Sequence, residues 1–237
     1  MTTTAFQLGL PLATLALFAG TAHAQTTTSP FYVEASIGIT HSNSEYANQV
    51  RESVANSTVF KFESATYDET GTTGGRVAMG WRALPNLAFE VGYTNFGRTD
   101  SRASVSRVQA PGQLDVIAGR FRANAVTFDA VGMLPITQSF AATARVGVAL
   151  TEQKYSQTRA IANEPAPAYT SYPTNRQTRL HWGFGAQYSF NPNVALVANY
   201  ERIESVGHDF SNRSIDNGSR AGTFGYGLLS VGMRYTF

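Results

Sequence analysis

Eight segments in which apolar and polar residues alternate constrain the fold of this chain more than any other feature. Alternation with a period of two is the pattern of a β-strand that has one apolar and one polar face. Most of the segments have about the 9–11 residues that a tilted strand needs to cross the hydrocarbon core of a membrane. They cover residues 31–40, 74–82, 87–96, 123–134, 140–150, 179–190, 194–203 and 225–237.

The connections between these segments alternate strictly between long and short. The short ones are residues 83–86, 135–139 and 191–193, and the long ones are residues 41–73, 97–122, 151–178 and 204–224. A soluble β-sandwich has no reason to sort its loops in this way. A transmembrane barrel does, because tight turns face the periplasm, together with both termini, and long loops face outward. The sequence therefore predicts an all-β fold, an eight-stranded antiparallel up-and-down transmembrane β-barrel.

Composition narrows the class further. No segment after residue 24 approaches 18 consecutive apolar residues, so transmembrane helices are excluded, whereas alternating strands produce no such run. The chain has no cysteine, which excludes disulfides and thiolate metal sites. The formal net charge of +2 is too small to indicate a nucleic-acid partner. Alternation also continues through residues 114–121, so we expect the second long hairpin to protrude from the membrane as paired strands.

The first residues are typical of an export signal. Leu8 to Ala19 is a short apolar run, and Ala22-His23-Ala24 is an A-x-A cleavage site before Gln25. The start contains no Lys or Arg, and an uncleaved N-terminal helix is the alternative interpretation. We expect a signal peptide at residues 1–24 and a barrel domain at residues 25–237, exported to the outer membrane of a Gram-negative bacterium.

The last strand carries a more specific pattern, in which apolar residues occupy alternate positions up to a C-terminal aromatic residue. They are Leu229, Val231, Met233, Tyr235 and Phe237. This resembles the terminal strand of outer-membrane proteins, which in those families is the signal for the barrel-assembly machinery. Together with residues 31–38, 87–97 and 231–237, it makes the mature chain similar to small barrels of the OmpA/OmpX type. That resemblance implies a fold and an assembly route but no activity. Larger members add a periplasmic peptidoglycan-binding domain after the barrel, and we expect none here.

Alternation places eight charged side chains on the inner face, four acidic and four basic. They are Glu34, Arg76, Arg82, Glu90, Asp129, Arg145, Glu201 and Arg234. The interior of an eight-stranded barrel is just wide enough for side chains to fill it. Because an unpaired buried charge costs several kcal/mol, we expect a lumen ion-pair network. The hairpin registers place Asp129 opposite or one diagonal from Arg145, and barrel closure places Glu34 level with Arg234. The network is interpreted as a structural plug or as a gated ion path.

The histidines are the candidate catalytic residues of this chain. His41 and Ser42 are adjacent on a strand and therefore point to opposite faces, and the pair lacks the His-x-Ser spacing of barrel lipid A deacylases. His181 faces inward near Glu201, and His208 lies beside Asp209 in the fourth long connection. No cluster has metal-ligand spacing, and no glycine-rich turn precedes a helix. We expect no catalytic site, cofactor or metal.

The second long connection is rich in arginine, and arginine binds phosphate through two parallel hydrogen bonds. These candidate lipopolysaccharide contacts are Arg98, Arg102, Arg107, Arg120 and Arg122, with an ordinary solvated charge run as the alternative. The sequence predicts a non-enzymatic surface barrel that serves envelope integrity or adhesion, with a host or surface protein as a possible loop partner. A narrow porin-like channel for ions or small solutes is the rival interpretation. A lipid-modifying enzyme is the third, and it would need a catalytic pair at the outer rim.

Overall fold

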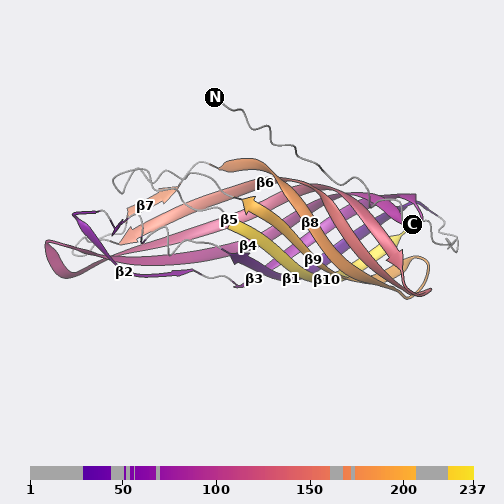
Figure 1. The fold of residues 1–237 in the computed structure, drawn as a ribbon, viewed down its shortest axis with the longest axis horizontal. Helices are drawn as coiled ribbons and strands as arrows, with labels where there is room; N and C mark the ends of the chain where they lie inside the picture. The colour runs from indigo at the N-terminus through magenta and orange to yellow at the C-terminus, as the bar shows by residue number, and fades with distance from the viewer. Residues whose placement is uncertain are drawn as a thin grey trace, which may run out of the picture.

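The computed structural model describes residues 29–43, 51, 54–55, 57–67, 70–160, 168–171, 174–206 and 224–237. Ten β-strands make up one antiparallel sheet (Figure 1). They are β1 (Phe31–Asn43), β2 (Phe60–Tyr67), β3 (Thr70–Leu84), β4 (Leu87–Arg107), β5 (Ala110–Pro135), β6 (Phe140–Ala160), β7 (Ala168–Ser171), β8 (Asn175–Ser189), β9 (Val194–Val206) and β10 (Phe224–Thr236). Among these residues, no helix has both the length and the apolar character to cross a membrane. The expected signal peptide lies outside the described residues.

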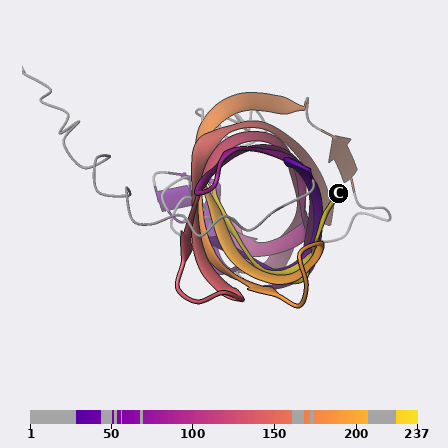
Figure 2. The same ribbon diagram turned by 90° about the vertical axis from the view of Figure 1, so that its right-hand side faces the viewer.

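Eight of the strands form a closed ring. Their order is β4, β3, β1, β10, β9, β8, β6 and β5, and pairing of β5 with β4 completes the circle. Figure 2 shows the ring end-on. Apart from the end residues Phe190 and Phe237, each of the eight segments with alternating residues lies in one ring strand, so the predicted eight-stranded antiparallel barrel is confirmed.

One end of the barrel holds the short turns, the beginning of β1 and the end of β10, and we call it the turn end. There the Phe237 amide donates to the Phe31 carbonyl at 3.2 Å, and the Thr236 amide donates to the Asn193 carbonyl at 2.8 Å. Pro85 and Asn86 form the turn between β3 and β4. Proline suits a turn because it has no N–H to offer the ladder of a closed sheet. The opposite end, where β4 and β5 are joined at Val108 and Gln109, is called the far end.

The far end confirms the predicted protrusion of the second long hairpin as paired strands, and it adds two strands that were not predicted. Residues 97–122 are not a long loop: β4 and β5 stay paired as far as Arg107 and Ala110, and only Val108 and Gln109 turn the chain. The continued alternation had indicated this extension. The strands β2 and β7 were not predicted, and they pair with the extended parts of β4 and β6. Both are short, and isolated short alternations are hard to distinguish from loop sequence.

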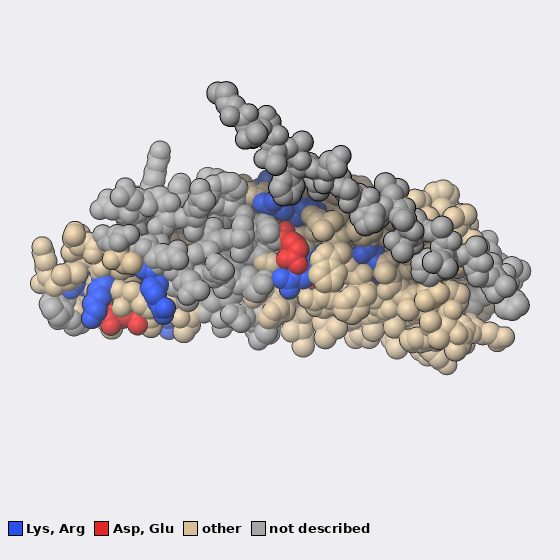
Figure 3. Space-filling model, viewed as in Figure 1, with Lys and Arg blue, Asp and Glu red and all other residues tan. Residues whose placement is uncertain are grey.

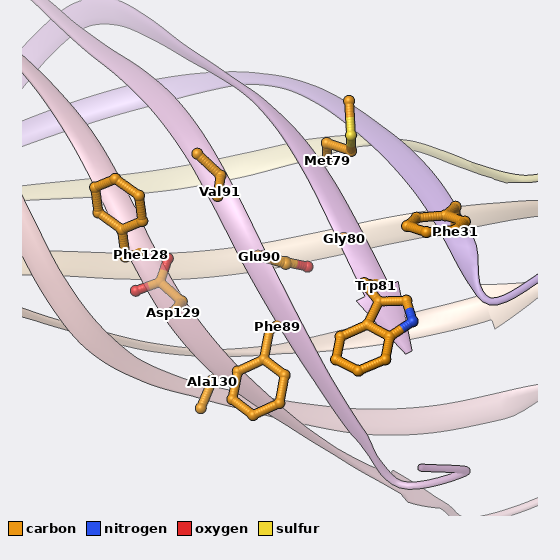
Figure 4. A pocket seen from close by; sticks show the side chains of 10 residues that line it. All are labelled: Phe31, Met79, Gly80, Trp81, Phe89, Glu90, Val91, Phe128, Asp129 and Ala130. Atoms are coloured by element: carbon orange, nitrogen blue, oxygen red, sulfur yellow. The ribbon is translucent and has the colours of Figure 1, made fainter. Parts of the chain in front are cut away.

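The outer wall is an apolar surface. Outward side chains such as Ile37 and Phe184 are exposed in the isolated chain. Figure 4 shows a shallow hollow in this wall, lined mainly by apolar side chains that include Phe31, Trp81 and Phe89. On the face visible in Figure 3, the part nearest the turn end is largely free of charged side chains, which gather toward the far end. This distribution suits a wall in contact with lipid.

The core lies inside the ring, in layers along the barrel axis. Near the turn end, Tyr32, Ala88, Val131 and Met133 form one small apolar cluster. Toward the far end lies a larger group, which we call the aromatic cluster. It consists of Phe96, Phe121, Ala123, Ala125, Ala149, Tyr155, Ile203, Tyr226 and Leu228. Charged residues fill the layer between the two.

Candidate functional site

The middle layer of the lumen contains one titratable or charged side chain from each of the eight ring strands. We call this group the ionic cluster. In ring order from β1 to β10 through β3 it consists of Glu34, Arg76, Glu90, Asp129, Arg145, His181, Glu201 and Arg234. All eight are buried, and strand alternation turns every one of them inward. The cluster therefore joins every strand of the ring at its centre.

Arg76 is the hub of the ionic cluster. Its guanidinium lies 3.1 Å from Glu90 and 3.3 Å from both Asp129 and Glu201, with Glu34 at 3.9 Å. One cation on β3 thus faces carboxylates on β1, β4, β5 and β9. A planar guanidinium carries five donors in a fixed fork, which allows it to contact several acids at once.

Arg145 and Arg234 contact three of these four acids. Arg145 lies 2.7 Å from Glu201 and 3.5 Å from Glu90. Arg234 lies 2.6 Å from Glu34 and 3.3 Å from Glu90. The sheet register places Arg234 directly opposite Glu34 across the seam between β1 and β10. Glu90 is therefore shared by all three arginines.

His181 lies between two carboxylates. Its Nδ1 is 2.7 Å from Asp129, and its Nε2 is 3.5 Å from Glu201. A neutral imidazole can donate through one nitrogen only, whereas the imidazolium donates through both. Four acids and three arginines make up the rest of the cluster. A protonated His181 would make the whole group neutral.

Arg82 does not join the cluster, although its position on the inner side of β3 had indicated that it would. Its side chain is only half-buried, near the turn end, and within the described residues no acid lies within ion-pair distance of it. Asp129 lies one diagonal from Arg145 in the register, but it contacts Arg76 and His181 instead. Strand parity gives the face on which an arginine lies but not its depth along the barrel, and Arg82 lies too near the turn end to reach the acids of the cluster.

Three uncharged polar side chains complete the cluster and were missed by reasoning from charge. The Tyr32 hydroxyl donates to Glu90 at 2.7 Å, and the Arg234 guanidinium stacks 4.2 Å from the centre of the Tyr32 ring. Asn199 donates to Glu34 at 2.9 Å and accepts from Arg145 at 3.3 Å. Gln187 accepts from Arg234 at 2.9 Å. All three stand at inward positions of their strands, which is the signal that could have identified them.

Two glycines leave room for the long side chains. A Cβ at Gly92 would stand 2.7 Å from the Arg76 guanidinium and 2.8 Å from the Thr127 hydroxyl. At Gly80 it would overlap the ring of Tyr32. A close approach of this kind requires a residue without a side chain.

The other predicted sites are spread over the outer surface. Leu229, Val231, Met233, Tyr235 and Phe237 are all exposed on the outer wall, and their role in assembly stays a prediction. Arg98 and Arg120 flank Asp100 at 2.9 and 3.4 Å. Arg102 and Arg122 are exposed on the same wall. Arg107 lies apart from them, 3.6 Å from the buried Asp115.

The remaining histidines form no reactive group. His41 is half-buried and the adjacent Ser42 is buried, as the opposite faces of a strand require. His208 and Asp209 lie outside the described residues. No three His, Asp or Glu side chains in the described part of the chain are arranged to hold a metal ion.

Comparison with known proteins gives a family that agrees with this geometry. The family described as OmpA-like transmembrane domain matches residues 26–237. The chain belongs to that family. It is an outer-membrane β-barrel of a type that resides in Gram-negative bacteria. No curated protein sequence matches the chain significantly.

Solved structures of other small barrels are similar to this OmpA-like chain. Neisserial surface protein A is 19% identical, with 88% of this chain and 98% of that chain covered and a TM-score of 0.44. Ail, the attachment invasion locus protein of Yersinia pestis, is 17% identical, with 86% and 99% covered and a TM-score of 0.41. The N-terminal β-barrel domain of Pseudomonas aeruginosa OprF is 10% identical, with 88% and 98% covered and a TM-score of 0.43.

The ionic cluster of this OmpA-like barrel is suited to holding strands together. Positive and negative groups largely alternate around the ring, so each carboxylate faces at least one cation at 3.3 Å or less. Such a group needs every partner in place, because removal of one leaves the others buried without compensation.

Proposed function

We propose that this chain is a non-enzymatic structural protein of the outer membrane, a barrel whose bore is closed by the ionic cluster. The observation that carries the proposal is the contribution of one cluster member by every ring strand. Arg76 alone contacts acids on four other strands. These contacts between strands stabilise the ring, and they keep the charged groups of the cluster paired with one another.

The arrangement of charges favours a plug over a narrow porin-like channel. A conducting pore tends to segregate charges of one sign along its path, as in the rings of acids or arginines that select ions. Here Glu34, Glu90 and Arg234 come from three strands and meet within 3.3 Å. Ions in transit would have to displace these short contacts.

The outer rim favours a structural role over a lipid-modifying enzyme. The one adjacent His–Ser pair, His41 and Ser42, stands on opposite faces of β1. The inward histidine, His181, contacts two carboxylates of the ionic cluster rather than a hydroxyl nucleophile. A nucleophile and its base must lie within hydrogen-bond reach for such chemistry.

The experiment compares a bacterial strain that lacks the protein with strains that regain it. We expect the deletion to raise the entry of large antibiotics or detergent. The full chain should restore the barrier, and so should a variant without residues 102–118, which joins the paired residues Ser101 and Gly119 by a short turn. Unchanged permeability in the deletion strain would contradict an envelope role.

A second candidate role, binding of a host or surface protein, is favoured by the far end. The extended β4, β5 and β6 carry β2 and β7 on their flanks, and within the described residues each of these two strands pairs on one side only. An unpaired strand edge can accept a strand from a partner. The shortened variant should then lose adherence to host cells while it keeps the barrier, and equal adherence of both forms would exclude this role.

A further inference from the structure

Four neighbouring strands of the barrel carry a cation at the same place on the outer wall. The continuous row of apolar outward side chains ends at Tyr93 on β4, at Val126 on β5, at Leu150 on β6 and at Leu180 on β8. Two outward positions further toward the far end, each strand has an exposed basic residue. These residues are Arg98, Arg122, Lys154 and Arg176, and we call them the basic belt. On β4 the spacing includes one extra residue, where Gly97 adopts a positive φ of 73°.

The members of the basic belt are close neighbours. Arg98 stands opposite Arg122 in the sheet register, and Arg122 stands opposite Lys154. Arg176 on β8 stands opposite Glu152, two residues before Lys154 on β6. Like charges directly opposite one another destabilise a sheet. A bound anion would remove that cost.

The acids near the belt do not neutralise it. Asp100 lies 2.9 Å from Arg98 but is shared with Arg120 at 3.4 Å. Glu152 is shared between Lys154 at 3.2 Å and Arg176 at 3.1 Å. Within the part of the chain that the structure describes, Arg122 has no acid within ion-pair distance. The four cations of the belt are thus accompanied by two acids, and the central arginine faces the surroundings unpaired.

Among the described residues, the other side of the barrel has no such excess. Beyond Val77, the second outward position on β3 is Thr73. On β9, Arg202 follows Tyr200 outward and is paired with Glu204. In the part of the chain that the structure describes, the basic belt therefore covers one sector of the wall, formed by β4, β5, β6 and β8.

The height of the belt matches the polar layer of a membrane. On β5, β6 and β8, two outward positions correspond to four residues, or about 13 Å along the strand at about 3.3 Å per residue. With a strand tilt of about 40°, this places the belt about 10 Å beyond the apolar wall. Long basic side chains can also bend back toward the interface. The belt therefore reaches the depth at which lipid phosphates lie.

We propose that the basic belt binds the phosphate groups of the glycolipid in the outer leaflet, lipopolysaccharide. The arginines supply paired donors to phosphate oxygens, and Lys154 adds a point charge. The proposal keeps Arg98 and Arg122 from the candidates suggested by the sequence and adds Lys154 and Arg176. It leaves out Arg107, which is directed to Asp115. It goes beyond the structural role and requires only that the far end faces outward.

The test titrates the full chain, folded in detergent, with diphosphoryl lipid A and counts bound lipid by native mass spectrometry. We expect Arg122→Gln with Lys154→Gln to weaken binding at least tenfold. The control is Arg51→Gln with Lys61→Gln, which removes the same charge away from the belt and should change affinity less than twofold. Phosphatidylglycerol and inorganic phosphate serve as competing probes and should displace lipid A poorly.

Two results would overturn the proposal. Equal loss of affinity in the belt variant and in the control would show that net charge alone attracts the lipid. Equally tight binding of phosphatidylglycerol would show a general anionic-lipid surface without preference for the glycolipid. Retained heat-modifiable migration in electrophoresis checks that each variant is folded. Because binding is measured in detergent, its outcome does not depend on the envelope experiment above.

Discussion

The ionic cluster and the aromatic cluster occupy the same lumen but fill it by different physics. In the ionic cluster, Arg76 and Glu90 are held by contacts of fixed geometry with groups on several other strands. In the aromatic cluster, Phe121 stacks on Tyr155 with ring centres 4.5 Å apart, and Phe96 lies 5.4 Å from Tyr226. Apolar contact is non-directional, whereas each ion pair requires a particular partner at a particular level.

The two clusters differ in how strongly they depend on the register between neighbouring strands. A shift of one residue between neighbouring strands turns every inward side chain outward. Such a shift between β1 and β10 would separate Glu34 from Arg234, and the acid would be left without the cation it now meets at 2.6 Å. The aromatic cluster adds buried apolar area but distinguishes registers less sharply. We infer that the ionic cluster specifies the register and that the aromatic cluster mainly contributes stability.

The largest expected effect is the loss of the hub. Arg76→Leu removes the cation that contacts four acids and leaves them with two arginines and His181. Breaking a buried pair costs about 3–5 kcal/mol, and this change should reach or exceed the upper end of that range. Equilibrium unfolding in urea, with the protein in lipid vesicles, measures the free energy. A loss below about 1.5 kcal/mol would place Arg76 in the class of tolerant positions.

The second effect isolates one pair at the seam. Arg234→Leu alone should cost about 3–5 kcal/mol, because Glu34 is then buried without its closest cation. Glu34→Leu combined with Arg234→Leu should recover much of that loss, since both charges are gone. A double-mutant cycle gives the coupling energy directly. Additive losses would mean that the two side chains do not stabilise each other.

The smallest effect is expected in the aromatic cluster. Phe121→Leu keeps an apolar side chain and should cost about 1–3 kcal/mol through lost buried area and the lost ring contact. The lost stack with Tyr155 accounts for about 0.5–1.5 kcal/mol of it. The same urea titration compares this variant with Arg76→Leu. If the two losses were equal, the contrast between directional and non-directional filling would not hold.

The ring of strands and most members of the ionic cluster could be predicted from the sequence. Successive side chains of a strand point to opposite faces. Counting residues along each strand was therefore enough to place Glu34, Glu90 and Arg234 on the inner face. The register between β1 and β10 could also be predicted, because Glu34 and Arg234 each lie three residues from the turn end of their segment. Depth and direction of a side chain depend on the packed interior, which parity does not describe. For this reason Arg82 was placed in the cluster wrongly.

The eighth member of the ionic cluster is His181 and not Arg82. Its parity was visible in the sequence, but its position between Asp129 and Glu201 depends on how β8 lies against its neighbours. Tyr32 and Asn199 were missed for a similar reason, because the sequence does not show which acids lie beside an uncharged polar residue. The strands β2 and β7 depend on the extension of β4 and β6, which no local pattern specifies in full.

Closure of the bore by the ionic cluster is the central claim, and conductance across a planar lipid bilayer tests it most directly. The purified wild-type barrel should insert without steady single-channel current, because Arg76, Arg145 and Arg234 remain engaged with their acids across the lumen. Arg76→Leu should at most add brief, small leaks. A large and stable conductance in the wild-type protein would contradict the account and would favour the channel.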